Sequence, residues 1–220
     1  MDVAELLIAD EANPNVVDNA GNTPLMLGAR NGHHELISRL WEGKRRPDLE
    51  MRNADGCTAL MWAAMGGHVK AVRILLASAA AVDEATFNRV IMATDNDGLS
   101  VLAIAARTGQ EPIMKAVIEQ VLSSGGGPSA ETADAAKAVS KAMQQLAVLI
   151  ASKDKRGNTA LMWAIRNADQ SLERALDCCK VLLNLESGLE AIDHQNDVKA
   201  LLRTACLPCL LAVPAAAVDC

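Results

Sequence analysis

Cysteine is the residue type in this sequence with the most specific chemistry. Cys206 and Cys209 form a single CxxC pair, a spacing that can bind zinc or exchange a disulfide. Zinc needs more ligands than these two thiols, and neither a second pair nor a nearby His follows. A redox role would need a βαβ context, which the flanking sequence lacks. Cys178 and Cys179 occupy an apolar helical face, which indicates core packing. A metal or redox protein stays an alternative that bound zinc would reveal.

The run "SSGGGPS" at 123–129 precedes an expected helix, so it raises the question of a phosphate-binding loop. It lacks the Lys and the Gly spacing of such a loop, and it follows no expected strand. A flexible linker is the better interpretation. The rest of the chain offers no nucleophile with a base and an orienting group, and no carboxylate pair at a plausible site. We therefore expect no enzyme activity and no cofactor.

Composition excludes several other classes of protein. The formal net charge is −6, which gives no general attraction to nucleic acid or anionic lipid. No secretory signal is expected, because Asp2 and Glu5 stand where basic residues would. The longest apolar stretch, 205–218, is too short to span a bilayer and contains two prolines. The sequence favours a cytoplasmic protein with reduced thiols.

The elements that position these residues come from an internal repeat. Four ungapped blocks of similar sequence are "GNTPLMLGARNGH", "GCTALMWAAMGGH", "GLSVLAIAARTGQ" and "GNTALMWAIRNAD", starting at Gly21, Gly56, Gly98 and Gly157. The distance between successive starts grows along the chain, which indicates insertions of increasing length.

Each block predicts a hairpin turn followed by a short helix. An Asp or Asn precedes each block's Gly by three residues, which is a turn signal. A hydroxyl then stands at the expected N-cap, at Thr23, Thr58, Ser100 and Thr159. Small pairs such as Ala63-Ala64 let a neighbouring helix come close, and a Gly ends most of these helices. A second apolar helix follows each block, and stacking the helix pairs would bury their apolar faces.

This pattern resembles the ankyrin repeat, whose motif reads roughly D-x-x-G-x-T-P-L-H-x-A-A-x-x-G-H. The resemblance covers most of residues 3–123 and 152–193. It implies an all-α solenoid of stacked helix-turn-helix units with short hairpin loops. The family's first His is replaced by Met26, Met61, Ala103 and Met162. The hydrogen bond from the family's Thr to that His is therefore absent, and apolar packing must substitute.

The resemblance and the insertions predict the organisation of the chain. We expect a partial N-terminal repeat at 1–17, three ankyrin repeats at 18–123, a Gly-rich linker and inserted helix at 124–151, a fourth repeat at 152–193, and a degenerate C-terminal repeat with an apolar tail at 194–220. The inserted helix is amphipathic, with Leu146 and Ile150 on its apolar face. It either packs beside the second helices or docks a partner. A smaller insertion at 82–94 should lengthen a hairpin region, packed down by Phe87, Val90 and Ile91.

The resemblance also implies a function. Hairpin tips and the exposed side of the first helices form a concave surface in this family, which binds another protein. The matching positions here are Asn19, Asn22, Arg30, Asn31, Asp55, Met65, Asn96, Asp97, Arg107, Thr108, Lys155, Arg156, Asn158, Arg166 and Asn167, with Ala20, Ala54, Cys57, Gly66 and Leu99 beside them. The leading hypothesis is a protein-binding scaffold or adaptor. The alternative is the targeting or regulatory part of a larger enzyme such as a protein kinase, because the chain starts in mid-repeat.

Three of these positions predict the chemistry of the partner. Arg30, Arg107 and Arg166 stand at the same place in three blocks, with Met65 in the remaining one. Stacked units would align them as a basic stripe that attracts an acidic segment of another protein. The alternative is that each Arg is a solvated helix-end residue, favoured there by the helix dipole.

Overall fold

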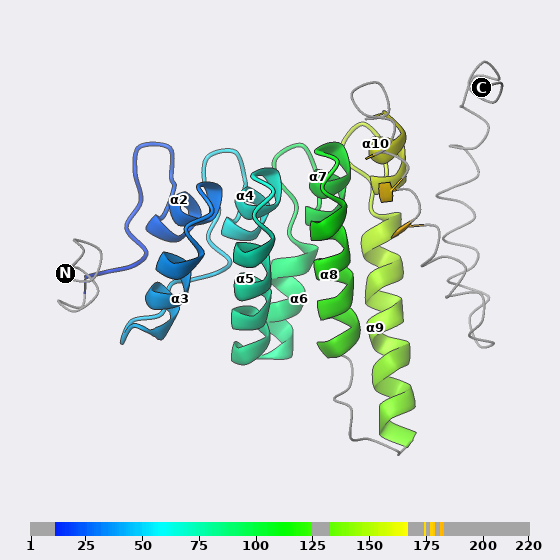
Figure 1. Cartoon of the computed structure of the whole chain (residues 1–220), viewed down its shortest axis with the longest axis horizontal. Coiled ribbons are helices and arrows are strands. Elements are labelled where there is room, and N and C mark those ends of the chain that lie inside the picture. The colour runs from blue at the N-terminus through cyan, green and yellow to red at the C-terminus, as the bar shows by residue number, and fades with distance from the viewer. Residues whose placement is uncertain (1–11, 125–132, 167–173, 175–176, 179–180, 183–220) are drawn as a thin grey trace.

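The computed structural model of the chain describes residues 12–124, 133–166, 174, 177–178 and 181–182. Within these ranges the chain is a row of stacked helix pairs (Figure 1). The pairs are α2 (Pro24–Arg30) with α3 (His34–Glu42), α4 (Ala59–Met65) with α5 (Val69–Val82), and α7 (Val101–Arg107) with α8 (Glu111–Ser124), and α10 (Ala160–Arg166) opens a fourth unit. The described residues form no strand beyond one isolated bridge, Thr94 to Ser100. The expected all-α solenoid is confirmed.

The first helix of each unit begins at the hydroxyl that the sequence predicts. Thr23 Oγ1 accepts a hydrogen bond from the backbone N–H of Met26 at 3.2 Å. Thr58 and Ser100 make the same contact in the next two units, at 3.4 Å each. Each bond satisfies an amide that the helix itself leaves without a partner. These caps set where each first helix starts, and so which of its residues face the neighbouring units.

Small residues let the units approach closely. Successive first helices pack on one another, α2 on α4, α4 on α7 and α7 on α10, and the second helices pack α3 on α5 and α5 on α8. The alanines at these contacts, Ala29, Ala63 and Ala105 among them, are fully buried. Met26 and Met61 are buried as well, in line with apolar packing where the related motif has a His. The core is therefore continuous along the stack.

The expected inserted helix is present as α9 (Ala133–Ala151). It packs against α8 and α10, and Leu146 and Ile150 are buried as its apolar pattern predicts. The linker at 125–132 and the segment 183–220, including the apolar tail, lie outside the described residues.

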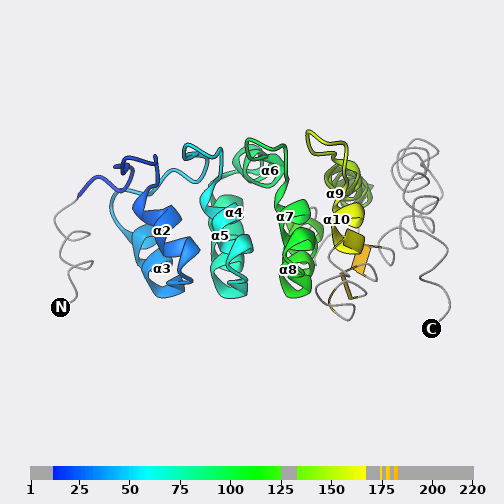
Figure 2. The same ribbon diagram turned by 90° about the horizontal axis from the view of Figure 1, so that it is seen from above.

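The smaller insertion forms a helix, α6 (Glu84–Met92), and not merely the longer hairpin region that its sequence predicted. Asp83 directly follows α5, and its Oδ1 accepts the backbone N–H of Thr86 at 2.6 Å, which caps the new helix. Phe87 is buried against the stack as expected. An ion pair between Glu84 and Lys141 joins α6 to α9. Both inserted helices lie on the side of the stack where the hairpin loops project (Figure 2).

Candidate functional site

The hairpins that precede the first helices are held by one repeated side-chain contact. Asp18 Oδ1 accepts the backbone N–H groups of Ala20 at 2.9 Å and Asn22 at 2.8 Å. Asn53, Asp95 and Asp154 each accept the equivalent two amides in their own hairpins. Hydrogen bonds from the side chain and the backbone of Asn22 lower the pKa of Asp18. The side-chain oxygens of these four residues are therefore occupied by the turns.

Backbone hydrogen bonds join the hairpins into a row. The amide of Ala54 donates to the carbonyl of Ala20 at 2.9 Å, and the amide of Asn96 donates to the carbonyl of Asp55 at 3.0 Å. The amide of Lys155 donates to the carbonyl of Asp97 at 2.8 Å, and this bond attaches the fourth hairpin to the third. This contact bridges the long insertion, because it brings the turn at 154–157 against the turn at 95–98. The row fixes the spacing between the tip residues of successive units.

The structure divides the residues predicted to form the binding surface. The exposed ones are Asn19, Arg30, Asn31, Asp55, Asn96, Asp97, Lys155, Arg156 and Arg166, the half-buried ones are Asn22, Met65, Arg107, Thr108 and Asn158, and Asn167 lies outside the described residues. Several polar ones are engaged within the fold. Asn96 Nδ2 donates to the carbonyl of Ala54 at 2.8 Å, and Asn22 accepts from Asn53 at 2.9 Å. These side chains hold the hairpin row together.

Two neighbouring positions, Cys57 and Leu99, are wrong as surface residues. Their exposed fractions are only 4% and 1%. Each follows the Gly of its hairpin, at the position that Asn22 and Asn158 occupy in the other units. Those polar residues are half-buried, whereas the apolar side chains of Cys57 and Leu99 are buried in the stack. Burial and then the nearby carboxylates of Asp95 and Asp55 raise the pKa of the Cys57 thiol to about 11. The thiol is therefore protonated at neutral pH and is not a nucleophile.

Arginine and tryptophan side chains stack across the boundaries between units. The guanidinium carbon of Arg30 lies 4.7 Å from the ring centroid of Trp62, which belongs to the next unit. Arg107 lies 5.8 Å from the ring of Trp163 in the unit that follows its own. Arg166, one helical turn after Trp163, lies 5.7 Å from the same ring. These distances fall within the range of cation–π attraction. The sequence places the arginines in equivalent positions, but it does not reveal this pairing.

The side of the first helices that carries these pairs is apolar and basic. We call it the first-helix face, and it consists of Leu27, Arg30, Trp62, Met65, Arg107, Trp163 and Arg166. Leu27 is 39% exposed and adds an apolar side chain to this face. The helices 24–30, 59–65, 101–107 and 160–166 contain no Asp or Glu, although the whole chain has net charge −6. The face can therefore attract negative charge and bury apolar side chains.

The described residues show no other chemistry at this face. They include no group of three or more His, Cys, Asp or Glu side chains placed to hold a metal ion. His68 Nε2 lies 3.0 Å from the carbonyl oxygen of Arg30, which is a structural contact between units. Among the described residues, no helix combines the length and the apolar composition that crossing a bilayer requires.

The sequence of this chain is similar to a known family and to several known proteins. A family model described as ankyrin repeats (3 copies) matches residues 1–86 and 46–124, and a single ankyrin repeat model matches residues 156–197. The chain is 32% identical over 120 residues to ankyrin repeat and KH domain-containing protein mask-1 of Caenorhabditis elegans, which covers 54% of this chain and 4% of that protein. It is 30% identical over 172 residues to the E3 ubiquitin-protein ligase XBAT33 of Arabidopsis thaliana, covering 78% of this chain and 30% of the ligase. The chain thus spans only a minor part of the length of these relatives.

Proposed function

This chain belongs to the ankyrin repeat family, and on that premise we propose that it is a non-catalytic cytoplasmic scaffold or adaptor that binds a partner protein through the first-helix face and the hairpin tips. Ankyrin repeats indicate binding to a protein partner. The observation that carries the proposal is the charge of this face. Three arginines and no acidic residue occupy the first helices of a protein that is acidic overall.

The partner segment that fits this face is acidic with apolar residues between its charges. The contacts with Trp62 and Trp163 place the guanidinium groups of Arg30 and Arg107 at this face, where their N–H groups can donate to carboxylates. Local positive charge steers an acidic segment to the face even when the two proteins have the same sign of net charge. Leu27 and Met65 offer apolar contact between the charged positions.

The experiment compares two double variants of equal charge change. The partner is first identified by affinity purification from the native cell with mass spectrometry. Arg107→Glu with Arg166→Glu should then slow association with that partner, and wild-type binding should weaken as salt rises. The control is Arg45→Glu with Lys70→Glu, two exposed residues outside this face. Folding should be nearly unchanged in the control variant, because exposed charges contribute little to stability. The first double variant also loses the contacts of half-buried Arg107 and of Arg166 with the Trp163 ring, at a cost of about 0.5–1 kcal/mol each, so its melting temperature is measured before binding is compared. Equal affinity of the wild type and the first double variant at low salt would remove the arginines from the binding site.

A second candidate is that the repeats are the targeting or regulatory region of a larger enzyme, such as a protein kinase. The observation that favours it is a match to 30% of the length of a relative that is itself named an E3 ubiquitin-protein ligase. Sequencing the full transcript tests this candidate, because a catalytic domain in the same reading frame would support it.

A further inference from the structure

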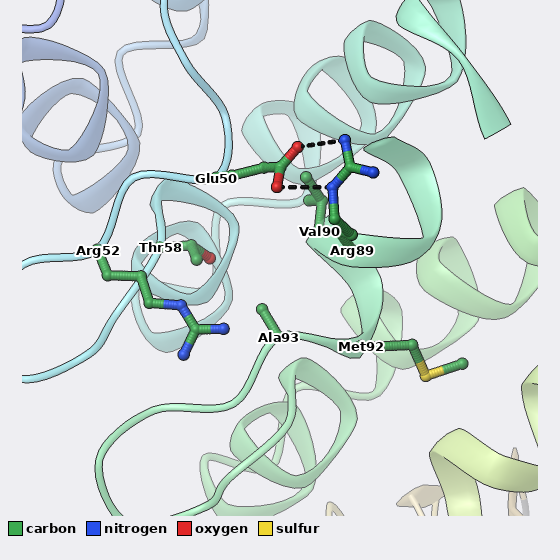
Figure 3. A pocket seen from close by; sticks show the side chains of 7 residues that line it. All are labelled: Glu50, Arg52, Thr58, Arg89, Val90, Met92 and Ala93. Carbon is green, nitrogen blue, oxygen red and sulfur yellow. Dashed lines mark hydrogen bonds and ion pairs between the residues drawn. The ribbon is translucent and has the colours of Figure 1, made fainter. Parts of the chain in front are cut away.

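A cleft of about 210 Å³ lies beside helix α6, and it does not include any residue of the first-helix face. We call it the α6 cleft, and its lining consists of Glu50, Arg52, Thr58, Arg89, Val90, Met92 and Ala93 (Figure 3). One wall is the segment that leads into the second hairpin. The other is the end of α6 and the residues just after it. The cleft therefore exists because 82–94 forms a helix.

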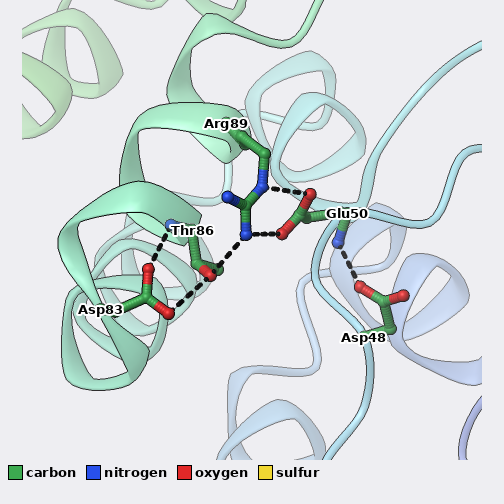
Figure 4. Close-up of polar contacts among 5 residues, drawn as sticks. All are labelled: Asp48, Glu50, Asp83, Thr86 and Arg89. Atoms are coloured by element: carbon green, nitrogen blue, oxygen red, sulfur yellow. Dashed lines mark hydrogen bonds and ion pairs between the residues drawn. The ribbon is translucent and has the colours of Figure 1, made fainter.

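Two of the residues that line the α6 cleft, Arg89 and Glu50, form an ion pair with each other. Arg89 Nε and Nη2 each donate to a carboxylate oxygen of Glu50 at 2.8 Å, and Nη2 also donates to Thr86 Oγ1 at 3.0 Å (Figure 4). The hydrogen bond from Arg89 holds the pKa of Glu50 below its ordinary value. Asp83 accepts from the amide and the hydroxyl of the same Thr86. The charges of Arg89 and Glu50 cancel, and neither group is free to bind a ligand strongly.

Arg52 is the positive charge that remains. Its Nη1 donates to the carbonyl oxygen of Thr94 at 2.9 Å, which ties the guanidinium across the cleft. Figure 3 shows the guanidinium extending from its own segment toward Ala93. Among the residues that the structure describes, no carboxylate forms an ion pair with Arg52. A fixed guanidinium with unused N–H groups is a ready donor to a planar anion.

The volume of the α6 cleft and the chemistry of its lining limit which ligands can bind there. Ligand pockets for whole small molecules occupy roughly 300–1,000 Å³, so this cleft is too small for a cofactor. A cleft of this smaller size suits a single side chain. Val90 and Ala93 line the cleft but are only 2% and 5% exposed, so they offer a small apolar contact to methylene groups, while exposed Arg52 meets a terminal charge. A free phosphate carries no methylene groups, so it would contact Arg52 but make no apolar contact with the wall of the cleft.

We propose that the α6 cleft is a second binding site, which takes a glutamate side chain of a partner polypeptide. Arg52 donates hydrogen bonds to the carboxylate, and Val90 and Ala93 contact the methylenes. A glutamate reaches the guanidinium with two methylenes to pack on that wall, whereas an aspartate has one. The site does not depend on the first-helix face, since the two share no residue.

The test uses short probes on the full chain. The probes are the N-acetylated, C-amidated peptides Ala-Glu-Ala and Ala-Gln-Ala, and inorganic phosphate. Titrations are followed by NMR at the side-chain Nε–H of Arg52 and the backbone amide of Ala93. The glutamate peptide should shift both signals saturably and bind about fivefold tighter than the glutamine peptide, the effect expected of one partly exposed charge pair. Phosphate should bind more weakly than the glutamate peptide.

Two variants complete the experiment. The Arg52→Gln variant should bind the glutamate peptide about fivefold more weakly than the wild type does, as measured from the shift of the Ala93 amide signal. Arg45→Gln removes an equal charge from an exposed residue outside the cleft and should change nothing. Equal binding of the two peptides to the wild-type chain would overturn the proposal, and that comparison stands even if Arg52→Gln fails to fold. An equal loss in both variants, or tighter binding of phosphate at the same signals, would also overturn it.

Discussion

Asp154→Asn tests whether a single indole hydrogen bond contributes to the stability of the fourth unit. Trp163 Nε1 donates to Asp154 Oδ2 at 2.9 Å, while Oδ1 accepts the backbone amides of the hairpin. The second unit contains the alternative arrangement. Asn53 uses its oxygen for the hairpin and its Nδ2 for Asn22, and the buried Nε1 of Trp62 has no hydrogen-bond partner. The variant would therefore leave the indole N–H of Trp163 without an acceptor, as that of Trp62 is, while Leu99 stands where Asn22 accepts in the second unit.

The expected cost follows from the unpaired donor. An asparagine at 154 keeps one oxygen for the hairpin but turns an amide N–H₂ toward the indole N–H. A buried polar group without a partner costs about 1–3 kcal/mol. Because Trp163 is only half-buried, we expect a loss of about 1–2 kcal/mol, from the lower part of that range. In a chain of this size such a loss lowers the melting temperature by about 2–8 °C.

The stability difference between the wild type and Asp154→Asn should also depend on pH, because Asp154 titrates and asparagine does not. Burial raises the pKa of Asp154, but hydrogen bonds from Asn158, Trp163 and Arg156 together hold it below the ordinary value of 3.8. A carboxyl group with a lowered pKa in the folded state stabilises the fold above its unfolded pKa. That contribution is lost as the pH falls through the folded pKa. The stability difference between wild type and variant should therefore be constant from about pH 5 to 7 and shrink below about pH 4.

The assay is urea unfolding followed by far-UV circular dichroism, at pH 7 and at acidic pH. The matched control is Asn53→Asp, the reverse exchange in the second unit. It offers Trp62 an acceptor but gives up the 2.9 Å bond to Asn22, so its net effect at pH 7 should stay below about 1 kcal/mol. Identical urea midpoints for wild type and Asp154→Asn at pH 7 would refute the reasoning.

Two further predictions concern packing and backbone conformation. Ala63 is fully buried between first helices, so Ala63→Leu should cost about 1–3 kcal/mol by overpacking; an unchanged thermal midpoint would contradict the stacking described above. Gly32 has φ +72°, and a Cβ there would lie 2.4 Å from the ring of His68, whereas Gly157 has φ +80° and open space around it. Both Gly32→Ala and Gly157→Ala should lose about 1–2 kcal/mol from the left-handed backbone, and Gly32→Ala should lose measurably more because His68 must move. Equal thermal midpoints for the two glycine variants would show that the contact with His68 contributes nothing.

The sequence by itself determined the local architecture of each unit. Hydroxyl caps such as Thr58, small residues such as Ala63 and glycines such as Gly32 act on residues a few positions away. Their effects therefore depend on spacing along the chain. The same spacing recurs in the first three blocks and, apart from the Gly, in the fourth. This is why the helix starts, the hairpin turns and the all-α stack could be predicted without any knowledge of how the units pack.

Only the tertiary structure decided which side chains of different units meet. The stacking of Arg30 on Trp62 and of Arg107 on Trp163 depends on the offset between neighbouring units, which the bonds along the hairpin row set. The burial of Cys57 and Leu99 also needed the tertiary structure, because the residues at the equivalent positions, Asn22 and Asn158, are half-buried. The α6 cleft combines Arg52 and Arg89 from two segments that no local pattern relates. Sequence periodicity describes one unit at a time, whereas a binding surface is made of contacts between units.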